Sequence, residues 1–198
     1  MALGKDSSPV YRAFHHWLNK NRGKIKADDN KTVIYSGMDS GGMPEWRKLA
    51  DHARDIRRLT KVDPEWQPIE QVLSKLAFDI SDYKIDAPLP SSALRFGSVW
   101  DFACKAASKS YITRHESQQV WKNLSAWYVK NSSGHVWIWK GDVLKAYPDL
   151  MLAEIPVLMR RRELSPQNEQ DLIKLFPEAS KVIEKWRGDT QVGRKAGR

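Results

Sequence analysis

The apolar positions of this chain recur mainly with helical spacing. Near the N-terminus they fall on one face of a helix, at Val10, Phe14, Trp17 and Leu18. Ser7 or Ser8 followed by Pro9 is typical of a helix start, because proline fits the first helical turn. The pattern therefore predicts a first helix from Pro9 to about Asn21.

Further segments follow the helical pattern, and β-branched or aromatic runs between them indicate strands. Helices are expected over about 44–59, 67–80, 96–108 and 113–130, with a last helical region over 165–188 that Pro177 interrupts. Thr113 and Glu116 have the spacing of a capping box. Strands are expected over 32–35 and 135–139. The apolar run over 150–159 also resembles a buried strand, although Glu154 interrupts it.

This alternation of helices and short strands predicts an α/β fold. A helical N-terminal portion would pack with a small, at least partly parallel sheet flanked by helices. A chain of 198 residues suits one compact main domain. We expect residues 1–30 to form a helical extension, 31–187 to form the main domain, and 188–198 to form a disordered basic tail.

Composition and charge narrow the class of protein. The net charge of +9 suits an acidic protein, an anionic membrane surface or a nucleic acid as partner, and a solvated basic surface explains it as well. No apolar stretch approaches the roughly 20 residues of a membrane span, so we expect a soluble protein. Of the three kinds of partner, a membrane is not expected. The single cysteine, Cys104, excludes an intramolecular disulfide and is expected to be a buried thiol. No histidines have HxxxH or HExxH spacing, so no metal site is expected.

Glu154 is the most informative residue, because it is a carboxylate inside an apolar run. Burying an unpaired carboxylate costs several kcal/mol, so such a residue is usually neutralised, hydrogen-bonded or part of a cleft. Trp121 and Ser125 lie one turn apart on the preceding helix and share a face. Together the three could stack a flat ring and hold a sugar. The same helix face also carries Leu124 and Tyr128, and this aromatic stripe could instead pack in the core. Glu154 could instead pair with an arginine, and both alternatives are open.

A glycine-rich loop follows the first expected strand. Ser36-Gly37 opens the loop and a helix follows it. This is the order in which α/β folds present backbone amides and a helix N-terminus to phosphate. Neither GxxxxGK[ST] nor GxGxxG is present, and an ordinary strand-to-helix turn explains the glycines equally well.

Two motifs in the second half of the chain carry a resemblance to a known family. They are Trp121-x-x-x-Ser125 and Pro148-x-Leu150-x-x-x-Glu154-x-Pro156-x-Leu158. They resemble the second half of the ADP-ribosyl cyclase and NAD glycohydrolase family. The likeness spans about residues 31–158 and is closest to the disulfide-free toxin domains that bacteria deliver by contact-dependent inhibition or type VI secretion.

The resemblance implies that the chain hydrolyses the nicotinamide–ribose bond of NAD to ADP-ribose and nicotinamide. NADP is a further candidate substrate, minor cyclisation stays open, and no cofactor is implied because NAD is itself the substrate. Glu154 would be the catalytic carboxylate that stabilises an oxocarbenium-like ribosyl group. Trp121 would stack on nicotinamide, while Ser125 and Ser36 would bind ribose or phosphate.

Other positions implied by the resemblance depart from the family pattern. Tyr35 stands where the family has a tryptophan, Leu150 where it has an aromatic residue, and Gly37 where animal members carry arginine. The family's Thr-Leu-Glu segment has its nearest counterpart in residues 59–65, where either Asp63 or Glu65 would supply a second carboxylate. In the family, that carboxylate influences the split between cyclisation and hydrolysis. Because this chain has no clean counterpart of the segment, we expect plain hydrolysis.

The resemblance also implies a place of action and a partner. Such a toxin would be secreted or delivered by a specialised system, without an apolar leader, and would act in the cytoplasm of a target cell. A cognate immunity protein would block it, and an acidic one would suit the basic chain. The alternative hypothesis is an RNA-directed toxin or a nucleic-acid-binding module, because basic and tryptophan side chains bind RNA by charge and stacking.

Overall fold

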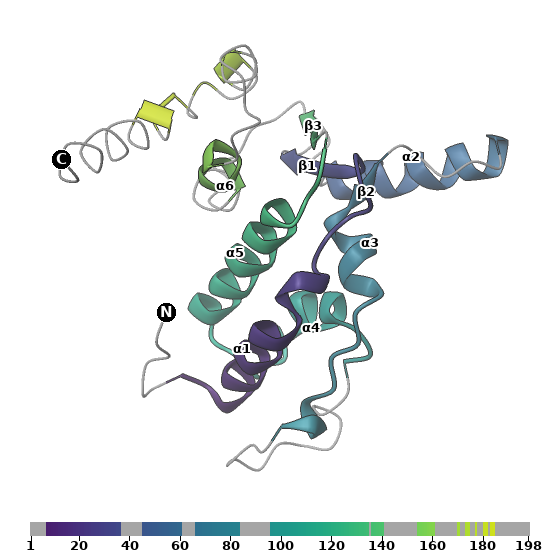
Figure 1. Ribbon diagram of the computed structural model, residues 1–198. Helices are drawn as coiled ribbons and strands as arrows, with labels where there is room; N and C mark the ends of the chain where they lie inside the picture. The colour runs from purple at the N-terminus through teal and green to yellow at the C-terminus, as the bar shows by residue number, and fades with distance from the viewer. Residues whose placement is uncertain are drawn as a thin grey trace.

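The computed structural model describes residues 7–36, 45–60, 66–83, 96–134, 136–140 and 154–160, and several single residues between 170 and 184. The chain is mixed α/β, mostly helical, with a small three-stranded parallel sheet (Figure 1). This confirms the predicted α/β class, the parallel sheet and the helical N-terminal portion. Within the described ranges, no helix has both the length and the apolar character that crossing a membrane requires.

Two helices begin at the caps that their sequences predict. Helix α1 spans Pro9–Asn21, and the hydroxyl of Ser8 accepts a hydrogen bond from the Tyr11 N–H at 3.2 Å. Helix α5 spans Arg114–Lys130 and begins with a complete capping box between Thr113 and Glu116. The second carboxylate oxygen of Glu116 accepts a hydrogen bond from the backbone N–H of Ser8 at 2.7 Å. One side chain thus joins the starts of α1 and α5.

The remaining helices are α2 (Glu45–Thr60), α3 (Ile69–Ser74), α4 (Val99–Lys105) and α6 (Ile155–Arg160). The helix predicted over 67–80 is wrong at both ends, because α3 is shorter and the chain continues through a 3-10 helix over Ile80–Asp82. Gln67 is extended rather than helical. It precedes Pro68, and the ring of a proline disfavours helical backbone in the residue before it.

The sheet has strand order β2-β1-β3, and both strand pairs are parallel. The central strand is β1 (Thr32–Ser36), between β2 (Gln67–Pro68) and β3 (Val136–Lys140). Thr32 lies opposite Gln67 on one side and opposite Val136 on the other. The carboxyl ends of all three strands therefore meet at one edge, where ligand sites of parallel sheets form.

One hydrophobic core joins α1, α3, α4 and α5 below the sheet (Figure 1). Its centre is aromatic. The ring centroids of Phe14 and Phe102 are 4.9 Å apart, and those of Phe78 and Phe102 are 4.8 Å apart. Ile183 is buried in the same core, so at least this residue of the C-terminal region packs on the folded body.

The expected strand around Glu154 is wrong for the residues that the structure describes. Glu154 directly precedes α6, which packs against α5. Pro156 gives the physical reason, because proline cannot donate a ladder hydrogen bond in a strand but fits the first turn of a helix. Residues 141–153 lie outside the described part of the chain.

The expectation of a buried Cys104 is also wrong, since this residue of α4 is exposed. The inward face of the helix consists instead of Val99, Phe102 and Ala103. The apolar sequence around Cys104 indicated burial, but the helical period turns its side chain away from the core.

Candidate functional site

The face of α5 that carries the predicted site residues points into the protein. Ser125 is 6% exposed and Tyr128 is fully buried, whereas Trp121 is half-buried. The ring of Trp121 packs edge-on against Trp100 of α4, with centroids 5.5 Å apart and planes at 78°. The Trp121 ring is thus held by a second tryptophan at the end of the stripe.

Tyr128 anchors this face to the sheet. Its hydroxyl accepts a hydrogen bond from the Val33 N–H at 3.0 Å and donates one to the Gln67 carbonyl at 2.5 Å. It therefore bridges β1 and β2 at the point where β2 has only two residues to pair. Because Tyr128 lies one turn after Ser125, the bridge also fixes the position of Ser125 relative to the sheet.

Glu154 is 8% exposed, so the sequence prediction of a buried or semi-buried carboxylate is confirmed. Burial is the main cause that raises the pKa of the Tyr128 hydroxyl far above its ordinary value. The hydrogen bond with the Val33 backbone lowers this pKa, and the negative charges of Glu70 and Glu154 raise it. Both carboxylates are thus close enough to Tyr128 to act on it electrostatically. Glu154 also takes part in a further interaction, so its burial is not that of an isolated charge.

Glu70 is the residue that sequence reasoning missed. It lies in the first turn of α3 and is 7% exposed. The available signal was its place between Ile69 and Val72, two apolar residues of the same short helix. Helical periodicity places Glu70 only beside the apolar face of this helix. Its burial was not predictable from periodicity, because it depends on contacts between α3 and α4, which are distant in sequence.

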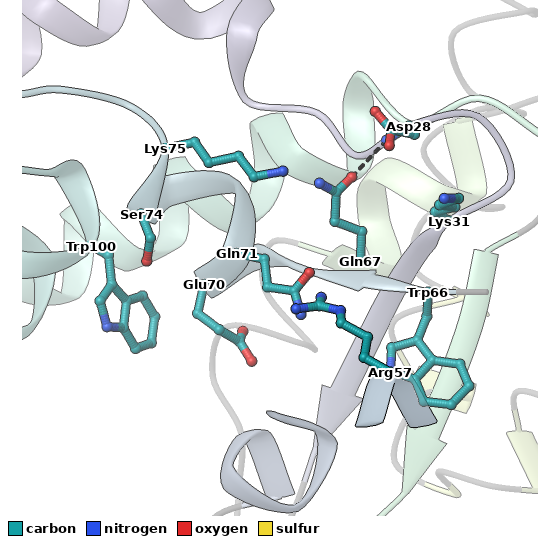
Figure 2. A pocket seen from close by; sticks show the side chains of 10 residues that line it. All are labelled: Asp28, Lys31, Arg57, Trp66, Gln67, Glu70, Gln71, Ser74, Lys75 and Trp100. Atoms are coloured by element: carbon teal, nitrogen blue, oxygen red, sulfur yellow. Dashed lines mark hydrogen bonds between the residues drawn. The ribbon is translucent and has the colours of Figure 1, made fainter. Parts of the chain in front are cut away.

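A cavity of about 480 Å³ opens beside Glu70 (Figure 2). This volume lies within the range of about 300–1,000 Å³ that small-molecule sites occupy. The cavity is lined by Asp28, Lys31, Arg57, Trp66, Gln67, Glu70, Gln71, Ser74, Lys75 and Trp100. They come from the loop before β1 and from α2, β2, α3 and α4 or the residues next to these elements, so the cavity lies where these elements meet.

The polarity of the cavity differs between its wall and its rim. Glu70 contributes a buried carboxylate, whereas Lys75 and Arg57 are exposed cations. Trp66 and Trp100 supply two half-buried aromatic surfaces. Such a cavity suits a ligand that has a flat ring, hydroxyl groups and negative charge at its outer end.

The structure connects the predicted residues to the cavity indirectly. Trp121, Ser125 and Glu154 do not line it, but Trp121 contacts the lining residue Trp100. Glu154 and the lining residue Glu70 both act on Tyr128. The predicted residues are thus linked to the cavity through Trp100 and through the electrostatic effect of Glu70 and Glu154 on Tyr128.

Other predicted site residues contribute less to this picture. Tyr35 and Ser36 are the last residues of β1, opposite Trp139 and Lys140 of β3, and only their backbone is described. The remaining four positions, Gly37, Asp63, Glu65 and Leu150, lie outside the described residues.

No group of three or more His, Cys, Asp or Glu side chains in the described part of the chain is arranged to hold a metal ion. Comparison of the sequence and fold with models of protein families, with curated proteins and with solved structures gives no match. The chemistry of the site therefore has to be argued from its own residues.

Proposed function

We propose that this chain is an NAD glycohydrolase that hydrolyses the nicotinamide–ribose bond of NAD to ADP-ribose and nicotinamide. The observation that carries the proposal is the pair of buried carboxylates, Glu154 and Glu70, whose charges both reach Tyr128 on the buried face of α5. Ser125 and Glu154 are the residues that the sequence resemblance singled out, and α5 and α6 pack together.

The chemistry of the bond suits this arrangement. Nicotinamide leaves NAD as a neutral molecule from a positively charged ring, so the leaving group needs no general acid. The enzyme needs a fixed negative charge near the ribose, because the transition state resembles an oxocarbenium ion. A buried carboxylate meets that need better than an exposed one, since its field is screened less. We assign this role to Glu154.

The neighbouring residues take supporting roles in the proposal. Trp121, held edge-on by Trp100, offers its face to nicotinamide. The hydroxyl of Ser125 binds the ribose. Glu70 supplies the second carboxylate that the sequence analysis expected from Asp63 or Glu65, since it follows α2 in the chain and lies in the wall of the cavity.

The proposal includes the fold and the biological setting. A small parallel sheet with its central strand first in the chain is compatible with an ADP-ribosyl cyclase-like fold. The enzyme would act as a delivered toxin on the NAD of a competitor cell. The net charge of +9 would speed association with an acidic immunity protein through electrostatic steering.

Release of nicotinamide from NAD by the purified chain tests the proposal, with Glu154→Gln as the parallel variant. Removal of a single preorganised electrostatic group at a reacting centre lowers kcat by about 10²–10³-fold, and we expect at least the lower value. Glu184→Gln is the matched control, because Glu184 is exposed. Circular dichroism spectra establish that each variant is folded.

The outcomes separate the assignments. Loss of turnover in folded Glu154→Gln with full activity in Glu184→Gln supports both the activity and the residue. Turnover that survives in Glu154→Gln removes Glu154 from the chemistry. If the unaltered chain releases nicotinamide from neither NAD nor NADP, the proposed activity is wrong and RNA becomes the next substrate to test.

A further inference from the structure

Two lysines of the cavity form no ion pair with any described residue. The side chains of Lys31 and Lys75 both line the cavity, and neither makes an ion pair or a hydrogen bond with any residue in the described ranges. Surface lysines are often unpaired, but these two face one concave space together with Arg57. Three cations around one cavity create a positive potential that attracts an anion.

The backbone holds the two lysines on opposite sides of Gln67. The carbonyl of Lys31 accepts a hydrogen bond from the Gln67 N–H at 2.6 Å, which ties Lys31 to β2. Lys75 ends α3, and its N–H donates to the Val72 carbonyl at 3.2 Å. Figure 2 shows the Lys75 side chain extending toward Gln67. Both lysines are therefore held at the cavity by elements that backbone hydrogen bonds fix.

Two carboxylates line the same cavity, and they differ in exposure. Asp28 is exposed, and its backbone N–H donates to the Gln67 side-chain carbonyl at 2.8 Å, as the dashed line in Figure 2 marks. Glu70 is buried in the wall. The lining thus carries three cations, Lys31, Arg57 and Lys75, against two carboxylates, Asp28 and Glu70.

The pyrophosphate of NAD carries two negative charges, which two cations balance. A phosphate monoester carries a further charge of about −1.5 to −2 at pH 7 and offers three strong acceptor oxygens. Cationic side chains accommodate the 2′-phosphate of NADP in other dinucleotide sites. We propose that the cavity binds the adenosine half of NADP and that Lys31 and Lys75 bind the 2′-phosphate of this half. NADP is then the preferred substrate of the glycohydrolase, an inference that rests on the proposed function.

Binding of two product-like probes tests the inference without any cleavage. Adenosine 2′,5′-bisphosphate and adenosine 5′-diphosphate carry two phosphates on the same nucleoside and differ in the position of one. We expect the 2′,5′-bisphosphate to bind about tenfold more tightly in isothermal titration calorimetry at one ionic strength, because only it places a phosphate at the lysines. The double variant Lys31→Ala/Lys75→Ala should bring the ratio of the two dissociation constants close to one.

The matched control is Lys109→Ala/Lys181→Ala, which removes the same charge from two exposed lysines that do not line the cavity. It should leave the ratio unchanged. Equal binding of the two probes by the unaltered chain overturns the inference, and so does a preference that persists in the double variant.

A kinetic measurement separates this inference from the proposed function. Nicotinamide release at equal kcat/KM from NAD and NADP, with equal probe binding, keeps the proposed function and refutes the phosphate preference. Selective probe binding that the double variant abolishes, without release of nicotinamide from either dinucleotide, supports the phosphate site and refutes the glycohydrolase. Selective binding together with a higher kcat/KM for NADP, lost in the double variant, supports both.

Discussion

Replacing Tyr128 by phenylalanine tests the junction between α5 and the sheet. The variant keeps the ring and removes only the hydroxyl that accepts from the Val33 N–H and donates to the Gln67 carbonyl. Tyr128 is 1% exposed, so water cannot replace the lost partner without a rearrangement. Each buried polar group left without a partner costs about 1–3 kcal/mol, and two such groups give about 2–4 kcal/mol after partial relaxation.

Urea unfolding followed by tryptophan fluorescence measures this loss. With a slope of roughly 2 kcal/mol per molar urea, the midpoint should fall by about 1–2 M. Tyr11→Phe is the matched control, because Tyr11 is buried but its hydroxyl has no hydrogen-bond partner among the described residues. Its unfolding free energy should change by less than about 0.5 kcal/mol. Equal, small losses in the two variants would refute the bridging role of the Tyr128 hydroxyl.

Two further predictions concern titratable groups. Burial opposes ionisation of the Glu116 carboxyl, but hydrogen bonds from Thr113 and Ser8 outweigh burial and lower the pKa of this group. The ionised carboxylate therefore stabilises the fold at pH values above the unfolded-state pKa of about 4.3, and this stabilisation is lost as the pH falls through the lower folded-state pKa. Glu116→Gln should therefore cost about 1–2 kcal/mol at pH 7 and much less near pH 3 in urea unfolding; an equal loss at both pH values would contradict this. Cys104 is an exposed residue, but partial desolvation of its thiol against α4 is the main cause that raises its pKa to about 11, so iodoacetamide should alkylate the folded chain at pH 8 at least about tenfold more slowly than the urea-unfolded chain. Equal rates would show that the folded environment does not suppress the thiolate.

The parts of the fold that were predictable are those with local signals. Ser8 before Pro9 and the Thr113–Glu116 box set the starts of α1 and α5 within their own first turns. The central and third strands were visible as β-branched or aromatic runs. Strand β2 was not, because two residues are too few to show any periodicity and its extended form depends on Pro68.

The candidate site was predictable only in part, for a related reason. Glu154 stood out because a carboxylate in an apolar run conflicts with its surroundings, although the run forms a helix and not a strand from Ile155 onwards. Glu70 stood in a short amphipathic segment, where a glutamate in the first helical turn is ordinary. The lysines of the cavity gave no signal at all, since Lys31 and Lys75 line one cavity only once β1 and β2 pair.

The pairing of β1 with β3 has a consequence for synthesis of the chain. Ser36 emerges from the ribosome about a hundred residues before its partner Lys140, which at 5–20 residues per second is a delay of roughly 5–20 s. The Ser8–Glu116 hydrogen bond imposes a similar wait on the start of α1. During that interval β1 has no β3 to pair with, and the start of α1 lacks its hydrogen-bond partner on α5. Folding of this protein is therefore a late event, and a chain arrested before α5 should be a ready substrate for chaperones and proteases.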